Sequence, residues 1–83
     1  MSTVTATKTI TSTSAAVFAG SSQLANRIQL IVINLDDSVA IMVNGLPVEP
    51  GERTKIKPLS SSAVIYAYSL GRAVQAMVQE VSI

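Results

Sequence analysis

The sequence predicts an all-β protein, a small antiparallel β-sandwich or barrel of about six to seven strands with an extended N-terminal arm. Short runs of β-branched and apolar residues alternate with turn residues such as Asn44-Gly45 and Pro50-Gly51. No stretch shows the 3.6-residue apolar period of an amphipathic helix. The chain has 83 residues, fewer than the ~100–150 of a typical domain. We therefore expect one domain over residues 24–83, preceded by the arm of residues 1–23.

The predicted arm is rich in Ser, Thr and Ala. Thr is β-branched and favours extended backbone. The large apolar side chains of the segment are too sparse to bury it, and they are Val4, Ile10, Val17 and Phe18. Two interpretations stay open: a frayed N-terminus, or an arm that a neighbouring subunit orders. On the second interpretation, deletion of residues 2–12 leaves the domain folded and weakens its assembly into particles.

The first strand of the domain is expected at residues 27–34. Both alternate sets of its residues are apolar, which is typical of a central strand covered on both faces. The turn residues Asp36-Asp37-Ser38 follow, and residues 39–43 form the next predicted strand, in a hairpin with the first. Asn44-Gly45 then suits a type I′ turn, which needs positive φ at both central residues.

Residues 46–52 are predicted to form a structured loop. Pro47 and Pro50 cannot donate a ladder hydrogen bond, and Pro50-Gly51 suits the middle of a type II turn. Residues 53–57 alternate charged residues with Thr54 and Ile56, a pattern typical of an edge strand.

Two more strands complete the prediction. Residues 63–68 have the length and composition of a strand, and residues 73–83 form the last one. The apolar positions of the last strand move by one residue near Gln79-Glu80, which predicts a β-bulge there.

The composition argues against an enzyme. The chain has no Cys and no His, which removes thiolate chemistry, the usual zinc ligands and the commonest acid–base side chain. Its net charge of +1 gives no strong field to attract nucleic acid or an anionic membrane. The apolar runs are far shorter than the ~20 residues that span a bilayer, and the N-terminus lacks a secretion signal. We expect no catalytic residue, cofactor, metal site, nucleic-acid partner or membrane association, and synthesis in the cytoplasm.

Three groups of residues allow both a functional and a structural interpretation. Asp36-Asp37 could bind a hard cation, although turn formation is the simpler role. The cations Arg53, Lys55 and Lys57 could bind phosphate or an acidic surface, or could protect an edge strand from aggregation. Tyr66 and Tyr68 lie on one face of their strand and could bind a sugar or a partner, or pack as half-buried core residues.

The small size of the chain favours association. Below about 70–80 residues a lone core seldom contributes more than about 3–5 kcal/mol, and this chain has neither disulfides nor a zinc site to add to it. We therefore expect a homo-oligomer, a dimer or trimer, or a part of a larger assembly.

Three short motifs occur in order from residue 27. They are Arg-x-x-Leu-Ile-Val-Ile-Asn-Leu from Arg27, Val48-Glu49-Pro50-Gly51-Glu52, and Val64-Ile65-Tyr66-Ala67, followed by a closing strand that ends near Glu80. In this order they resemble a family of small all-β structural proteins of tailed bacteriophages, over about residues 27–81. The chain differs from the family pattern at Asp36-Asp37 and at its second tyrosine, Tyr68.

The resemblance implies a virion protein present in many copies at the capsid surface, a decoration or cement protein that bridges major capsid subunits. Its partners would be the major capsid protein and copies of itself. Two alternatives stay open: a tail, collar or fibre-base adaptor, and a module that binds host glycans through its tyrosines. The expected partner-binding residues are Val4, Thr5, Thr7, Ile10, Pro47, Glu49, Pro50, Glu52, Tyr66 and Tyr68.

Overall fold

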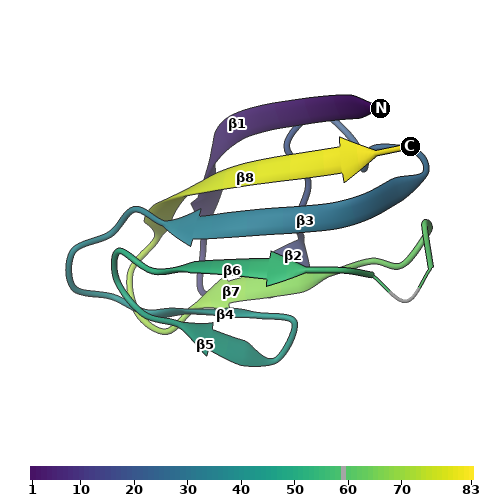
Figure 1. Cartoon of the computed structure of the whole chain (residues 1–83). Helices are drawn as coiled ribbons and strands as arrows, with labels where there is room; N and C mark the ends of the chain where they lie inside the picture. The colour runs from purple at the N-terminus through teal and green to yellow at the C-terminus, as the bar shows by residue number, and fades with distance from the viewer. Residues whose placement is uncertain (59) are drawn as a thin grey trace.

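The computed structural model describes residues 1–58 and 60–83, which form eight strands and no helix (Figure 1). The all-β class is confirmed, with one strand more than the upper predicted number. The strands are β1 (Ser2–Ile10), β2 (Ala15–Ala16), β3 (Arg27–Asn34), β4 (Ile41–Val43), β5 (Leu46–Val48), β6 (Arg53–Ile56), β7 (Tyr66–Ser69) and β8 (Val74–Ser82). The extra strand is β5, in a segment predicted as loop. It tolerates Pro47 because β5 is an edge strand, where a residue without an N–H loses no ladder bond on its open side.

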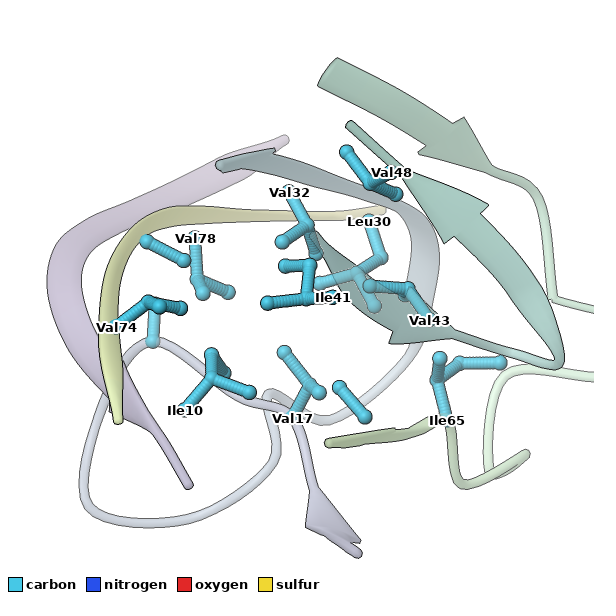
Figure 2. Packing of buried hydrophobic residues seen from close by; sticks show 13 residues of the cluster. Ile10, Val17, Leu30, Val32, Ile41, Val43, Val48, Ile65, Val74 and Val78 are labelled. Carbon is cyan, nitrogen blue, oxygen red and sulfur yellow. The ribbon is translucent and has the colours of Figure 1, made fainter. Parts of the chain in front are cut away.

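The strands form two four-stranded sheets, in which every pairing is antiparallel. Sheet A has the order β1-β8-β3-β6, and sheet B has the order β2-β7-β4-β5. Figure 2 shows Leu30 and Val32 of sheet A pointing toward Ile41 of sheet B. The apolar core therefore lies between the two sheets. Its members are Ile10, Val17, Ala19, Leu30, Val32, Ile41, Val43, Val48, Ile65, Ala67, Val74, Ala76 and Val78.

The predicted hairpin of residues 27–34 and 39–43 is wrong. Strand β3 pairs with β6 and β8, whereas β4 pairs with β5 and β7, so the connection crosses from one sheet to the other. The buried side chain of Asn34 fixes this crossing, because its Nδ2 donates to the carbonyl oxygens of Val39 (2.9 Å) and Val48 (3.1 Å). Its Oδ1 accepts from the N–H of Asp36 at 3.0 Å. The Asn34 side chain thus links the end of β3 in sheet A to Val39 and to the end of β5 in sheet B.

Strand β3 is central in sheet A, as predicted, but it is not covered on both faces. Leu30 and Val32 are fully buried, while Ile31 and Ile33 on the opposite face are half-buried. The two isoleucines lie on a strand that is flanked by β6 and β8. The outer face of β3 is therefore apolar and partly accessible in this chain.

The predicted bulge at Gln79-Glu80 is also wrong. The register between β1 and β8 is unbroken over all nine pairs, and every second residue of β8 from Val74 to Ser82 is buried. Glu80 itself occupies the inward position at which the apolar alternation of β8 is interrupted. The irregularity lies in β3 instead, where Ile28 is the extra residue between Arg27 and Gln29.

Residues 2–10 of the predicted arm are extended, but they belong to sheet A. Strand β1 pairs with β8 from Ser2 opposite Ser82 to Ile10 opposite Val74. Ile10 is only 7% exposed and lies in the core. This segment is therefore an integral edge strand of the domain rather than an appendage, and it brings the two chain ends side by side (Figure 1).

The predicted reversals are confirmed by backbone geometry. Asn44 and Gly45 have φ angles of 53° and 77°, as the type I′ turn between β4 and β5 requires. Gly51 has a φ of 78°, and the N–H of Glu52 donates to the carbonyl of Glu49 at 3.0 Å, as in a type II turn. Strand β6 is an edge strand, as its alternating charges predicted.

Candidate interaction surfaces

An uncharged row of side chains crosses the outer face of sheet B. Tyr68 of β7 lies opposite Met42 of β4, which in turn lies opposite Pro47 of β5. Tyr66 shares this face, opposite Ala16 of β2. Residues alternate between the two faces along β7. Ala67 and Ser69 are buried and point inward, so the rings of Tyr66 and Tyr68 point outward. We call Ala16, Met42, Pro47, Tyr66 and Tyr68 the tyrosine face.

The tyrosine face has the character of a protein contact surface. Tyr66 is 55% exposed and Tyr68 is 36% exposed, so much of each ring is accessible. Tyrosine presents a rigid apolar body with one polar end and is enriched in protein interfaces, as is methionine. Because these five residues carry no charge, burying them against a partner incurs no ionic desolvation cost.

The outer face of sheet A has a different character. Thr3, Thr5, Thr7 and Thr9 alternate along β1 on this face, and their neighbours on β8 include two glutamines. Gln75 Nε2 donates to Thr9 Oγ1 at 2.9 Å, and Gln79 Nε2 donates to Thr5 Oγ1 at 3.2 Å. These bonds form a polar ladder that joins β1 to β8 from the solvent side.

The structure divides the expected partner-binding residues between several places. Pro47, Tyr66 and Tyr68 meet on the tyrosine face, whereas Thr5 and Thr7 lie on the outer face of the opposite sheet. Val4 is half-buried and packs against the core. Ile10 is a core residue, and this corrects its assignment as a partner contact, because its side chain has almost no surface to offer.

The remaining expected residues form the turn of residues 49–52. Glu49 and Glu52 are exposed, but Glu52 Oε1 also accepts from the N–H of Glu49 at 3.2 Å. Two backbone bonds of 2.9 Å anchor the turn to β3, from Gly51 N–H to the Asn34 carbonyl and from Asn34 N–H to the Glu52 carbonyl. The turn is thus a fixed corner of the molecule that displays two carboxylates.

Asp36 has the turn-forming role. Its Oδ2 accepts from the N–H groups of Ser38 (3.0 Å) and Val39 (2.7 Å), and the guanidinium of Arg72 binds both carboxylate oxygens at 2.7 and 3.2 Å. The hydrogen bond from Arg72, followed by that from Ser38, lowers the pKa of Asp36 to about 2. Among the described residues no three acidic side chains gather as a metal site would require.

Replacement of Asp36 with asparagine is expected to change the acid stability of the protein. A carboxyl with a lowered pKa stabilises the fold above its unfolded pKa of about 4 and loses that effect as pH falls toward 2. The stability difference between the wild type and Asp36→Asn should therefore be constant at neutral pH and shrink between about pH 4 and 2. Urea midpoints measured across this range test the prediction, and a difference that does not change with pH contradicts it.

A buried ion pair, which the sequence did not lead us to expect, lies at the opposite end of β3. Arg27 Nη1 and Glu80 Oε2 are 2.9 Å apart, and both side chains are almost completely inaccessible. Glu80 also accepts from the backbone N–H groups of Ala19 (2.7 Å) and Leu24 (3.1 Å). The sequence signal for this ion pair was Glu80, an acidic residue at an inward position of β8, where the alternation is otherwise mainly apolar.

Arg27 completes this cluster through carbonyl oxygens. Its Nη1 donates to Val17 at 2.9 Å and its Nη2 to Ala63 at 3.1 Å. Among the buried side-chain nitrogen and oxygen atoms that the structure describes, only Arg27 Nε lacks a hydrogen-bond partner. The pair therefore stabilises the long connection between β2 and β3, and its charged atoms are occupied by backbone groups rather than open to a substrate.

Comparison with models of known protein families, with curated proteins and with solved structures finds no match to this chain.

Proposed function

We propose that this chain is a non-enzymatic structural protein of a virion, a capsid decoration or cement protein that bridges and stabilises major capsid subunits. The tyrosine face is the observation that carries the proposal, because it is an exposed, uncharged surface on a rigid sheet. The ordered phage-like motifs described above give the proposal its viral context. In this proposal the two sheets form a β-sandwich, and the partners are the major capsid protein and copies of the chain itself.

The stabilising mechanism is mechanical. Each copy lies across a joint between capsid subunits and removes apolar surface from water, at roughly 25 cal/mol per Å² less the cost of ordering the contact. The net charge of +1 leaves contact rather than long-range attraction to provide the affinity. Many weakly charged copies, each contributing a modest free energy, would then raise the work needed to separate the shell.

The expected result of removing the tyrosines is loss of shell binding. In the variant with both Tyr66→Ser and Tyr68→Ser, affinity for undecorated shells should fall at least about 30-fold, since a central aromatic anchor contributes about 2 kcal/mol or more. Met77→Ser is the matched control, since Met77 is as exposed as Tyr68 (36%) but lies on the outer face of β8 in the opposite sheet. Co-sedimentation of purified shells with each protein measures the effect. Equal binding by the tyrosine variant and the control would contradict the proposal.

Copy number separates a cement protein from a tail, collar or fibre-base adaptor. Quantitative mass spectrometry of purified particles should count hundreds of copies of a lattice protein, against a dozen or fewer of an adaptor. Absence of the chain from the particles of the phage that encodes it would refute both roles.

A host-glycan-binding module is the second candidate. It is favoured by the two tyrosine rings that lie two residues apart on one exposed face, since aromatic rings can stack on sugars. Glycan binding by the isolated protein that is lost in Tyr66→Ala would support this function. No binding across a broad set of host-surface glycans would eliminate it.

A further inference from the structure

The four sheet edges differ sharply in how they are protected. Strand β6 carries the exposed cations Arg53 and Lys55, β5 contains Pro47, and β2 has only two residues. Short strands, edge cations and proline all prevent a sheet edge from pairing with another chain. Strand β1 has nine residues, no proline and no bulge in its register with β8, and it carries a single cation, Lys8.

The outer edge of β1 is free of intramolecular partners. Of the residues that the structure describes, only those of β8 bond to the backbone groups of β1. Figure 1 shows β1 along the margin of sheet A, with β8 on its one paired side. Alternate N–H and C=O groups of an edge strand point away from its neighbour, so β1 presents an unsatisfied row about 30 Å long, at about 3.3 Å per residue.

The one charge on β1 does not block this edge. Lys8 points to the inner side of the sheet, where its Nζ donates to the carbonyl of Gly20 at 3.0 Å. The same atom lies 5.2 Å from the centre of the Phe18 ring. The ammonium is therefore held within its own subunit rather than extended across the edge.

We propose that β1 pairs with β1 of a second copy of this chain, antiparallel and about a two-fold axis at Ala6, to form one continuous eight-stranded sheet. In this register Thr3 faces Thr9 of the second copy, and Thr5 faces its Thr7. Thr–Thr neighbours across strands are favourable. On the inner side Val4 faces Lys8 of the second copy, so no two like charges are opposed.

The two-fold arrangement also preserves the faces of the sheet. Residues of equal parity oppose one another, so the threonines of both copies remain on the outer side and the core residues on the inner side. The half-buried side chains of Val4 and Ala6 gain cover from the second copy. A second copy in this register would therefore pair the free backbone groups of β1, cover its half-buried side chains and oppose no like charges.

This pairing goes beyond the proposed function and does not depend on it, because it is measured on the purified protein without any capsid. Light scattering and sedimentation equilibrium should give a mass twice the 8.7 kDa of the chain. A monomer at every concentration up to the millimolar range would overturn the proposal.

Charged substitutions locate the interface. In Thr5→Lys with Thr7→Lys, introduced lysines face each other twice across the axis. In Thr5→Lys with Thr7→Glu, each introduced lysine faces a glutamate. Both sites are exposed, and both variants lose the same bond from Gln79. We expect the first variant to raise the dimer dissociation constant at least tenfold relative to the second, and equal dissociation constants would assign the dimer to another surface.

A cysteine scan tests the register in a chain that has no native cysteine. Ala6→Cys should form a disulfide-linked dimer on mild oxidation, because directly opposed Cβ atoms lie about 4.5–5.5 Å apart. Thr9→Cys should remain monomeric on denaturing gels, since the two copies of residue 9 would lie about 20 Å apart at 3.3 Å per residue, too far for a disulfide. The reverse result, or equal cross-linking of both variants, would refute the pairing about Ala6.

Discussion

Replacement of Glu80 with alanine is expected to lower the free energy of unfolding by about 3–5 kcal/mol, because it leaves the buried charge of Arg27 without its counter-ion. It also removes the acceptor for the N–H groups of Ala19 and Leu24. A small domain has a free energy of unfolding of about 5–15 kcal/mol, so this loss is a large fraction of the total and should lower the urea midpoint markedly. Urea denaturation followed by circular dichroism measures the loss.

The neighbouring Gln79→Ala provides a control on the same strand. Its side chain faces outward and, among the residues that the structure describes, bonds only to Thr5, so the expected loss is within about 0.5 kcal/mol. A buried ion pair can often be replaced by apolar residues without loss. In this protein the double variant Arg27→Met with Glu80→Met should recover only part of the stability, because four backbone groups that the pair satisfies lose their partners. Full recovery would show that those backbone bonds contribute little.

Deletion of residues 2–12 is expected to abolish cooperative folding, contrary to the expectation for a detachable arm. The deletion removes the whole of β1 and uncovers one edge of β8 along nine residue pairs. It also removes Ile10 from the core and the bond of 2.7 Å from Ser69 N–H to the Thr11 carbonyl. Near-ultraviolet circular dichroism and thermal denaturation should show no native transition.

Point variants separate the contribution of packing from that of the strand. Ile10→Ala should cost about 2–5 kcal/mol, as large-to-small core substitutions do, whereas Thr7→Ala should change stability by less than about 0.5 kcal/mol. A truncated protein with native stability would restore the interpretation of residues 2–12 as an arm available to a neighbouring subunit.

The features that the sequence predicted correctly depend on local chemistry. The boundaries of β3 follow from the β-branched run of residues 27–34, and the turn at Asn44-Gly45 follows from its tolerance of positive φ. The edge position of β6 follows from its alternating cations. Each of these features is determined by residues that are neighbours in the chain.

The errors concern partners distant in the chain. Nothing within residues 27–43 indicates that β3 and β4 enter different sheets, since the decisive bonds of Asn34 reach as far as Val48. The bulge was predicted wrongly because a glutamate is expected to face solvent. Glu80 faces inward because it pairs with Arg27, which lies 53 positions earlier in the chain. Likewise, the alternation of Tyr66 and Tyr68 was visible in the sequence, but their neighbours Met42 and Pro47 became apparent only from the register of three strands.

The juxtaposition of Ser2 and Ser82 has a practical consequence. Polypeptide fused to either terminus would emerge from the same pole of the molecule, so a short linker could join the two ends without spanning the body. Proteins with adjacent termini tolerate circular permutation and insertion into a host loop. This small fold is therefore suited to insertion as a unit into a larger polypeptide, an arrangement that would leave the tyrosine face exposed.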